Sequence, residues 1–434
     1  MRGLALAAAL AAAVVLPEGP LGIGVPIVAA LMLTAVFVGR RMTALRLVLV
    51  LLALALTAQA ALLDATWVVA LDLVVAWVLA SFAASDVALA ALAAPVARLR
   101  EAPALTPRVS ERQGPALRGL ALGGIVLLPF LLLFLSADAA FAGFAGDLPL
   151  PSGESLLGRA ALLTSTLTAT LGLGLAVRRP LTRRWTVTGR QLEFAEWAIP
   201  LALLDLLFAA FVTVQLTVLF GGHDQVLDTA GLTYAEYARS GFWQLLTAAG
   251  LTFAVVAATL ALARPHDRRQ TLLLRLLLGT LCALTLVVLV SALHRLRLYE
   301  DAFGLTRMRL LAETVALWLG VLLALLTAAV WFRRARTSLS RAIVLATSIG
   351  LLTFSLSDPD RRVADRNVER WRASGVVDLG YLAGLSADAV PALLDLPARQ
   401  RQQAIAGIRE RLAQGDPWGS ANRSRARARD MLKS

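Results

Sequence analysis

Residues 272–293 read LLLRLLLGTLCALTLVVLVSAL, an apolar run that carries one charge, Arg275. A run of this length crosses about 30 Å of hydrocarbon when it forms an α-helix. A helix also satisfies its own backbone hydrogen bonds, which lipid cannot do. Runs of the same character recur at Gly119–Leu135, Leu201–Phe220 and Leu310–Trp331. The sequence therefore predicts an α-helical protein that crosses a membrane several times.

The composition agrees with a membrane protein and argues against most soluble classes. Hydrophobic residues make up 58% of the chain and charged residues 16%, whereas a soluble domain carries about 25% charged residues. The net charge of +13 does not indicate nucleic-acid binding, because most arginines lie in short loops between apolar runs. No nucleotide-binding loop, dinucleotide fingerprint or metal-ligand spacing occurs, so we expect no cofactor and no metal. The single cysteine, Cys282, excludes an intrachain disulfide.

Hydropathy predicts an all-α, polytopic bundle of about ten or eleven transmembrane helices with a small helical tail. The amino-terminal run Leu4–Leu16 resembles a signal peptide. We favour a first membrane helix, because a second apolar run, Gly24–Val38, follows almost at once. The candidate spans are 3–16, 22–39, 43–63, 65–84, 119–136, 159–177, 195–220, 241–263, 271–293, 308–332 and 341–357.

Basic residues alternate from loop to loop and predict an orientation. The loops after the second, fourth, sixth, eighth and tenth candidate spans carry arginine clusters, so we expect them in the cytoplasm. The intervening loops are expected outside, and those holding Asp138 and Asp224 are acidic. One outer loop breaks the rule, because His294-Arg295-Leu296-Arg297 is basic. We therefore expect its arginines to have partners.

The fall in hydropathy after Asp358 divides the chain into three parts. We expect amino-terminal spans with a basic cytoplasmic loop over 1–115, a main transmembrane domain over 116–357, and a soluble helical tail over 358–434. If every span is real, the tail lies outside, and if the last span is only peripheral, the tail lies inside.

Two short helices are expected within the tail. Ser386 is a candidate cap for the segment 387–396, and a helix over 398–414 follows it. The second helix would place one apolar face inward, formed by Ile405, Ile408 and Leu412.

Three polar residues within candidate spans are of interest, because an ionisable group in lipid is costly. Asp205 lies near the centre of the seventh span, with Gln215 on the same helix. Asp205 is either a functional carboxylate or a hydrogen-bonded link between helices, and the two interpretations have equal weight. For Asp72, in the fourth span, we favour the link.

Two outer segments hold most of the remaining candidate site residues. Thr233 and Glu236 have the spacing of a capping box, beside Tyr234, Tyr237 and Arg239. Tyrosines three residues apart share a helix face and suit the membrane interface.

The second outer segment contains Arg297, Tyr299, Thr306 and Arg309, and Thr306 is a candidate cap for the tenth span. We expect Arg297 to pair with a carboxylate. The candidate partners are Glu236, Glu300, Asp301, Asp378 and Asp388.

Several stretches resemble the bacterial multi-pass family known as domain of unknown function 4173, a relative of 4153. The resemblance covers candidate spans five to eleven and the tail, and it brings no established activity. It implies a polytopic protein of the bacterial plasma membrane. The matching stretches are Ser136–Phe141, Phe208–Gly222 (FAAFVTVQLTVLFGG), Thr233–Phe242 (TYAEYARSGF), Leu296–Arg309 (LRLYEDAFGLTRMR), Asn367–Arg370 (NVER), Asp378–Leu393 (DLGYLAGLSADAVPAL) and, more loosely, Trp418–Ala426.

These observations predict a plasma (inner) membrane protein with an outward-facing polar site under the tail. We expect a binding, sensory or accessory role in the cell envelope. The expected partners are the lipid bilayer, an anionic lipid or envelope ligand, and another membrane protein, but no nucleic acid. The alternatives are an enzyme acting on lipid-linked or phosphate-bearing substrates, and a proton-coupled transporter that uses Asp205. The candidate polar site is Asp138, Asp205, Gln215, Tyr234, Glu236, Tyr237, Arg239, Arg297, Tyr299, Thr306, Arg309, Asn367, Arg370, Asp378, Tyr381 and Asp388.

Overall fold

The computed structural model describes residues 19–38, 42–84, 114–138, 141, 192–220 and 241–433. The regular elements in these ranges are helices, apart from an isolated bridge between Leu192 and Ala263. The predicted all-α fold is therefore confirmed. Eight of the described helices are long and apolar enough to cross a membrane, so the chain is a multi-pass membrane protein.

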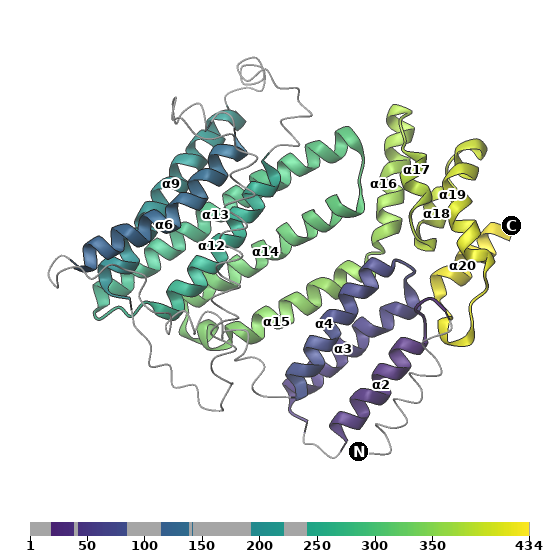
Figure 1. Cartoon of the computed structure of the whole chain (residues 1–434), viewed down its shortest axis with the longest axis horizontal. Coiled ribbons are helices and arrows are strands. Elements are labelled where there is room, and N and C mark those ends of the chain that lie inside the picture. Colours follow the sequence, from purple (N-terminus) through teal and green to yellow (C-terminus); the bar gives the residue numbers. More distant parts are fainter. Residues whose placement is uncertain are drawn as a thin grey trace. The chain divides into compact units, whose positions relative to one another are not determined.

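Most of the predicted spans that fall in the described ranges have a helical counterpart of spanning length. The helix α2 (Gly24–Phe37) is apolar but has only 14 residues. The predicted spans 3–16 and 159–177 lie outside the described residues. The spanning helices are α3 (Ala44–Leu62), α4 (Thr66–Ala84), α6 (Gly114–Ala137), α9 (Phe194–Phe220), α12 (Phe242–Leu262), α13 (Arg268–Phe303), α14 (Arg307–Trp331) and α15 (Arg333–Leu356) (Figure 1).

The helix α13 extends well beyond the predicted span and has 36 residues. The expectation that residues 294–297 form a loop was therefore wrong. The buried face of α13 continues through Val288, Ala292 and Arg295 at helical spacing. Residues 294–303 therefore continue the helix, and only residues 304–306 connect α13 to α14.

The chain forms two compact units. The first comprises Met1–Leu89, Phe303–Thr314 and Val344–Ser434, and the second comprises Ala90–Ala302 and Val315–Ile343. The predicted division at 115 and 357 follows hydropathy and remains a prediction.

In the second unit, α6 and α9 lie side by side (Figure 1). A Cβ atom on Gly119 would lie 2.3 Å from the Ala195 carbonyl oxygen, and one on Gly123 would lie 2.8 Å from a Leu203 methyl carbon. Two small residues four apart let membrane helices approach closely. Toward the other end of this helix pair, buried phenylalanines stack, with Phe134 and Phe211 centroids 4.1 Å apart.

In the first unit, α2, α3 and α4 pack together and the tail shares their core. Ala60, Leu63 and Val68, near the α3–α4 connection, belong to the same buried cluster as the tail residues Leu393 and Ile405. The tail elements are α16 (Pro359–Ser374), α17 (Leu379–Ala383), η2 (Ala387–Ala389), α18 (Val390–Leu393), α19 (Ala398–Ala413), η3 (Trp418–Ser420) and α20 (Arg423–Lys433) (Figure 1).

The tail bears out one sequence expectation and corrects another. The predicted second helix is α19, and Ile405, Ile408 and Leu412 are buried on it as expected. Ser386 precedes the short helix η2 but its side chain does not cap it. Instead, the Ser386 hydroxyl donates to the Asp388 carboxylate.

Candidate functional site

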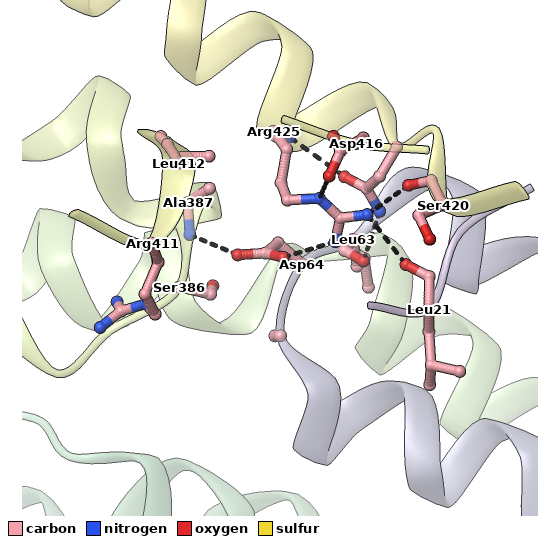
Figure 2. A network of polar contacts seen from close by, with 12 residues as sticks. Leu21, Leu63, Asp64, Ser386, Ala387, Arg411, Leu412, Asp416, Ser420 and Arg425 are labelled. Atoms are coloured by element: carbon pink, nitrogen blue, oxygen red, sulfur yellow. Dashed lines mark hydrogen bonds and ion pairs between the residues drawn. The ribbon is translucent and has the colours of Figure 1, made fainter. Parts of the chain in front are cut away.

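Arg425 of α20 is the centre of a polar cluster in the first unit (Figure 2). Its side chain is 6% exposed, and its guanidinium forms ion pairs with Asp64 at 2.8 Å and Asp416 at 2.9 Å. The same group donates to the backbone carbonyls of Leu21 and Ser420. A guanidinium carries five donors in a fixed fork, so one side chain holds four chain segments together. We call Asp64, Asp388, Asp416 and Arg425 the tail clamp.

Asp388 connects the tail to the turn between α3 and α4. Its carboxylate accepts from the amides of Asp64 and Ala65, the latter at 2.8 Å, and from the Ser386 hydroxyl. The Asp64 carboxylate in return accepts from the Ala387 amide at 2.9 Å (Figure 2). Burial raises the pKa of Asp388, against these hydrogen bonds. Hydrogen bonds in both directions thus fix the α3–α4 turn to the tail.

A second ion pair, Arg307 with Asp360, ties the start of α14 to α16. Asp360 is fully buried and also accepts from the Trp67 indole nitrogen and the Ser386 amide. Burial alone would raise the pKa of Asp360, but Arg307 and the Ser386 amide hold it below its ordinary value of 3.8. The Tyr381 hydroxyl accepts from the Arg307 amide at 2.7 Å.

The connection between α13 and α14 also contacts α16 of the tail. Gly304 has φ +80°, and a Cβ there would lie 2.4 Å from the Asn367 side-chain oxygen. Asn367 donates to the Leu305 carbonyl at 2.7 Å. The predicted cap is confirmed, because the Thr306 hydroxyl accepts from the Arg309 amide at 3.4 Å. Arg309 also donates to the Gly304 carbonyl and lies 5.9 Å from the Phe303 ring centroid.

The second unit contains a separate buried cluster around Arg295, which is 2% exposed. Its guanidinium pairs with Asp138, at the end of α6, and donates to Gln215 of α9 at 3.1 Å. Gln215 donates to Asp138 at 2.6 Å and accepts from Ser291 at 3.0 Å. Three membrane helices are thus joined by one network, which we call the arginine cluster.

Gly241 completes the arginine cluster from the start of α12. It has φ +86°, in the left-handed region, and a Cβ atom there would lie 2.1 Å from the Ala137 carbonyl oxygen and 2.8 Å from an Arg295 nitrogen. Only glycine meets both requirements without strain. Segments of the resemblance from α6, α9 and the start of α12 therefore meet at this point, and the matching stretch of α13 begins one residue after Arg295.

The predicted site residues fall into distinct places. The arginine cluster holds Asp138 and Gln215, and Thr306, Arg309, Asn367, Tyr381 and Asp388 lie in the tail or next to it. Asp378 caps α17, and Arg370 donates to the Val376 carbonyl. Tyr299 lies on α13 and is partly buried. Four of the predicted residues lie outside the described ranges: Tyr234, Glu236, Tyr237 and Arg239.

Asp205 and Arg297 lie apart from both clusters. Asp205 lies ten positions before Gln215 on α9, which separates the two by about 15 Å, and one of its carboxylate oxygens is buried with no hydrogen-bond partner among the described residues. Arg297 is exposed and forms no ion pair with Glu300 or Asp301, so that part of its expected pairing was wrong. The expected partner Glu236 is not described. Arg295, two residues earlier, has the buried partner instead.

Asp72 is the interhelical link that the sequence favoured. Its carboxylate is fully buried and accepts from the Ser355 hydroxyl of α15 at 2.8 Å. Sequence reasoning missed Asp64, Arg307, Asp360 and Arg425, whose positions at or near helix ends gave little signal. It expected the arginines of residues 294–297 to have partners, and Arg295 has one in Asp138.

The chemistry of these clusters is that of binding and of structural linkage. In the described part of the chain, no group of three or more metal-ligating side chains occurs. Asp138 is 2% exposed and paired with Arg295, so it is not placed to act as a general base on a substrate.

A family model described as Domain of unknown function (DUF4153) matches residues 27–396. The match covers the arginine cluster and, of the tail clamp, Asp64 and Asp388, and it ends before Asp416 and Arg425. No curated protein and no solved structure matches the chain. The matched family is the relative in the resemblance noted from the sequence, and membership of family 4173 remains a prediction.

Proposed function

The chain belongs to the family of the Domain of unknown function (DUF4153), and we propose that it has a binding or accessory role in the bacterial cell envelope through its tail and the span ends beneath it. The observation that carries this proposal is the tail clamp. Buried, hydrogen-bonded ion pairs join the tail to the α3–α4 turn and to α14. Such links give a fixed surface rather than a mobile lid.

The orientation follows from the ends of the helices in the first unit. The start of α2, the end of α3 and the end of α15 adjoin the tail. Their opposite ends carry Arg40, Arg41, Arg46, Arg334 and Arg336. Short basic loops remain in the cytoplasm, whereas long tails cross largely regardless of their charge. The tail and the tail clamp therefore face outward from the plasma membrane.

A proton-coupled transporter is the second candidate, because Asp205 is a carboxylate with a buried, unpartnered oxygen within a membrane helix. Ionisable groups at such positions often serve in proton relays. The enzyme alternative is weaker, because Asp138 is buried and paired with Arg295.

Complementation of a strain that lacks the gene separates these roles, with envelope sensitivity to detergent as the readout. A binding role predicts that Asp205→Asn restores resistance and that Arg425→Gln does not. Asp430→Asn, an exposed change on the same helix that does not line the cavity described below, is the control for expression. Restoration by Arg425→Gln together with failure of Asp205→Asn would favour transport and contradict the proposal.

A further inference from the structure

A cavity of about 240 Å³ lies between the tail and the span ends of the first unit. Its walls come from five elements: Gln59 and Leu62 of α3, Leu356 of α15, Asp388 of η2, Pro391 of α18, and α20. Sites for drug-sized ligands are usually larger, from about 300 Å³ upward. This cavity suits a small polar group.

One wall of the cavity offers an unused acceptor. Asp358 has φ +55°, an uncommon conformation for a residue other than glycine. Its Oδ1 atom is buried and has no hydrogen-bond partner in the described ranges. Asp388, by contrast, already accepts from two amides and a hydroxyl. A buried acceptor without a donor is costly, so Asp358 is suited to a ligand that carries N–H donors.

The α20 wall of the same cavity offers unused cations. Arg423 and Arg427 lie four residues apart on α20, on one face of the helix, and both line the cavity. They are exposed, and neither guanidinium forms a hydrogen bond or an ion pair with any described residue. Guanidinium groups bind phosphate oxygens in a bidentate manner. The cavity therefore presents a carboxylate and two phosphate-binding groups to one occupant.

The cavity also has a defined depth in the membrane. Leu62 and Leu356 are the last residues of two candidate spans, and both are exposed, at 37% and 63%. The ends of membrane spans lie at the level of the lipid headgroups. An occupant held there can extend acyl chains past these leucines into the bilayer.

We propose that this cavity binds the headgroup of an aminophospholipid, with the phosphate on Arg423 and Arg427 and the primary ammonium on Asp358. The proposal rests on the proposed function and gives its binding site a ligand class. Phosphatidylethanolamine has both groups. Phosphatidylcholine lacks N–H donors, and phosphatidylglycerol lacks the cation.

Native mass spectrometry of the full chain in detergent, with an equimolar mixture of these three phospholipids, tests the proposal. One charged hydrogen bond predicts a preference of about tenfold for phosphatidylethanolamine over phosphatidylcholine. Equal binding of the two, or a preference for phosphatidylglycerol, would overturn the proposal. Soluble phosphoethanolamine is added in a second arm, and displacement of the lipid at equal concentration would show a soluble ligand instead.

Variants test which residues bind the ammonium group and which bind the phosphate group of the lipid. Asp358→Asn should bring the preference close to unity, and asparagine tolerates the positive φ of this position. The double variant Arg423→Gln and Arg427→Gln should lower the binding of all three lipids. The matched control is Arg399→Gln with Arg409→Gln, two exposed changes on α19. A control that behaves like the α20 double variant would overturn the assignment.

The lipid site and the proposed function can fail separately. If the protein prefers phosphatidylethanolamine but Asp358→Asn complements fully, the lipid site is supported and its part in the proposed function is ruled out. If Arg425→Gln fails to complement but no lipid is preferred, the proposed function is supported and the lipid site is ruled out.

Discussion

At the scale of single residues, the arginine cluster depends on which arginine of α13 faces inward. Arg295 is 2% exposed and paired with Asp138, whereas Arg297 is exposed. Removing one partner of a buried pair leaves the other charge uncompensated.

We therefore expect Arg295→Gln to lower the free energy of unfolding by about 3–5 kcal/mol. Arg297→Gln, two residues away, should change it by less than about 0.5 kcal/mol. The unfolding of both variants in detergent, followed by circular dichroism, measures the difference. Equal effects would mean that Arg295 is not a buried partner.

Gly241 gives a second prediction at this scale. Gly241→Ala should destabilise the protein by more than about 1 kcal/mol, because alanine is strained at positive φ and its Cβ would meet the Ala137 carbonyl. Gly250→Ala is the control on the same helix, where a Cβ meets nothing within 4 Å. There alanine should be neutral or stabilising by about 0.5–1 kcal/mol. Thermal melting compares the two, and a stable Gly241→Ala protein would contradict the close approach.

How far the sequence predicts this site depends on the residue. Asp138 and Gln215 could be identified as polar residues at the ends of apolar runs, and the basic outer segment indicated that an arginine needed a partner. The choice between Arg295 and Arg297 required the helical phase of α13. That phase was available only once residues 294–303 were known to be helical. Asp64 and Arg425 are 361 residues apart in sequence, and no local pattern relates them.

At the scale of elements, the tail clamp and the nearby carboxyls Asp358 and Asp360 make tail docking dependent on pH. Arginine partners outweigh burial and hold the pKa values of Asp360 and Asp416 below 3.8. Their folded-state pKa values are depressed, so their stabilisation is present above pH 3.8 and is lost as pH falls through the folded values. Burial raises the pKa of Asp358 to about 7 and also that of Asp388. These two carboxyls act in the opposite direction, because their ionisation in the buried site is unfavourable. The stability of tail docking that they contribute falls as pH rises toward 7.

We therefore expect tail docking to be most stable at about pH 4, to weaken in stronger acid as Asp360 and Asp416 are protonated, and to weaken toward pH 7 as Asp358 and Asp388 ionise. Hydrogen exchange of the tail amides across this range measures docking. Arg425→Gln should raise the pH at which acid undocking begins, because Asp416 then keeps only the 2.7 Å bond from Arg429. The exposed pair Arg366 and Glu369 is the control, and Arg366→Gln should leave the profile unchanged. A tail whose protection factors, which correct exchange rates for the intrinsic pH dependence of amide exchange, do not change with pH would contradict the clamp.

At the scale of the whole molecule, hydropathy predicted the α-helical, multi-pass character because apolar length and helix formation are coupled in lipid. It did not predict the division into two units. The first unit combines the amino-terminal helices with the tail, and this pairing depends on side chains far apart in the sequence. The central claim is that the tail and its span ends form one outward-facing surface.

Cysteine labelling of intact cells tests this claim most directly. Cys282, the single cysteine of the chain, is first replaced by alanine. Ser374→Cys then places a thiol on the tail and Ser338→Cys one near the start of α15, both at exposed positions. An impermeant maleimide should label position 374 in intact cells and position 338 only after the membrane is permeabilised. Labelling of position 338 from outside, with position 374 protected, would contradict the account.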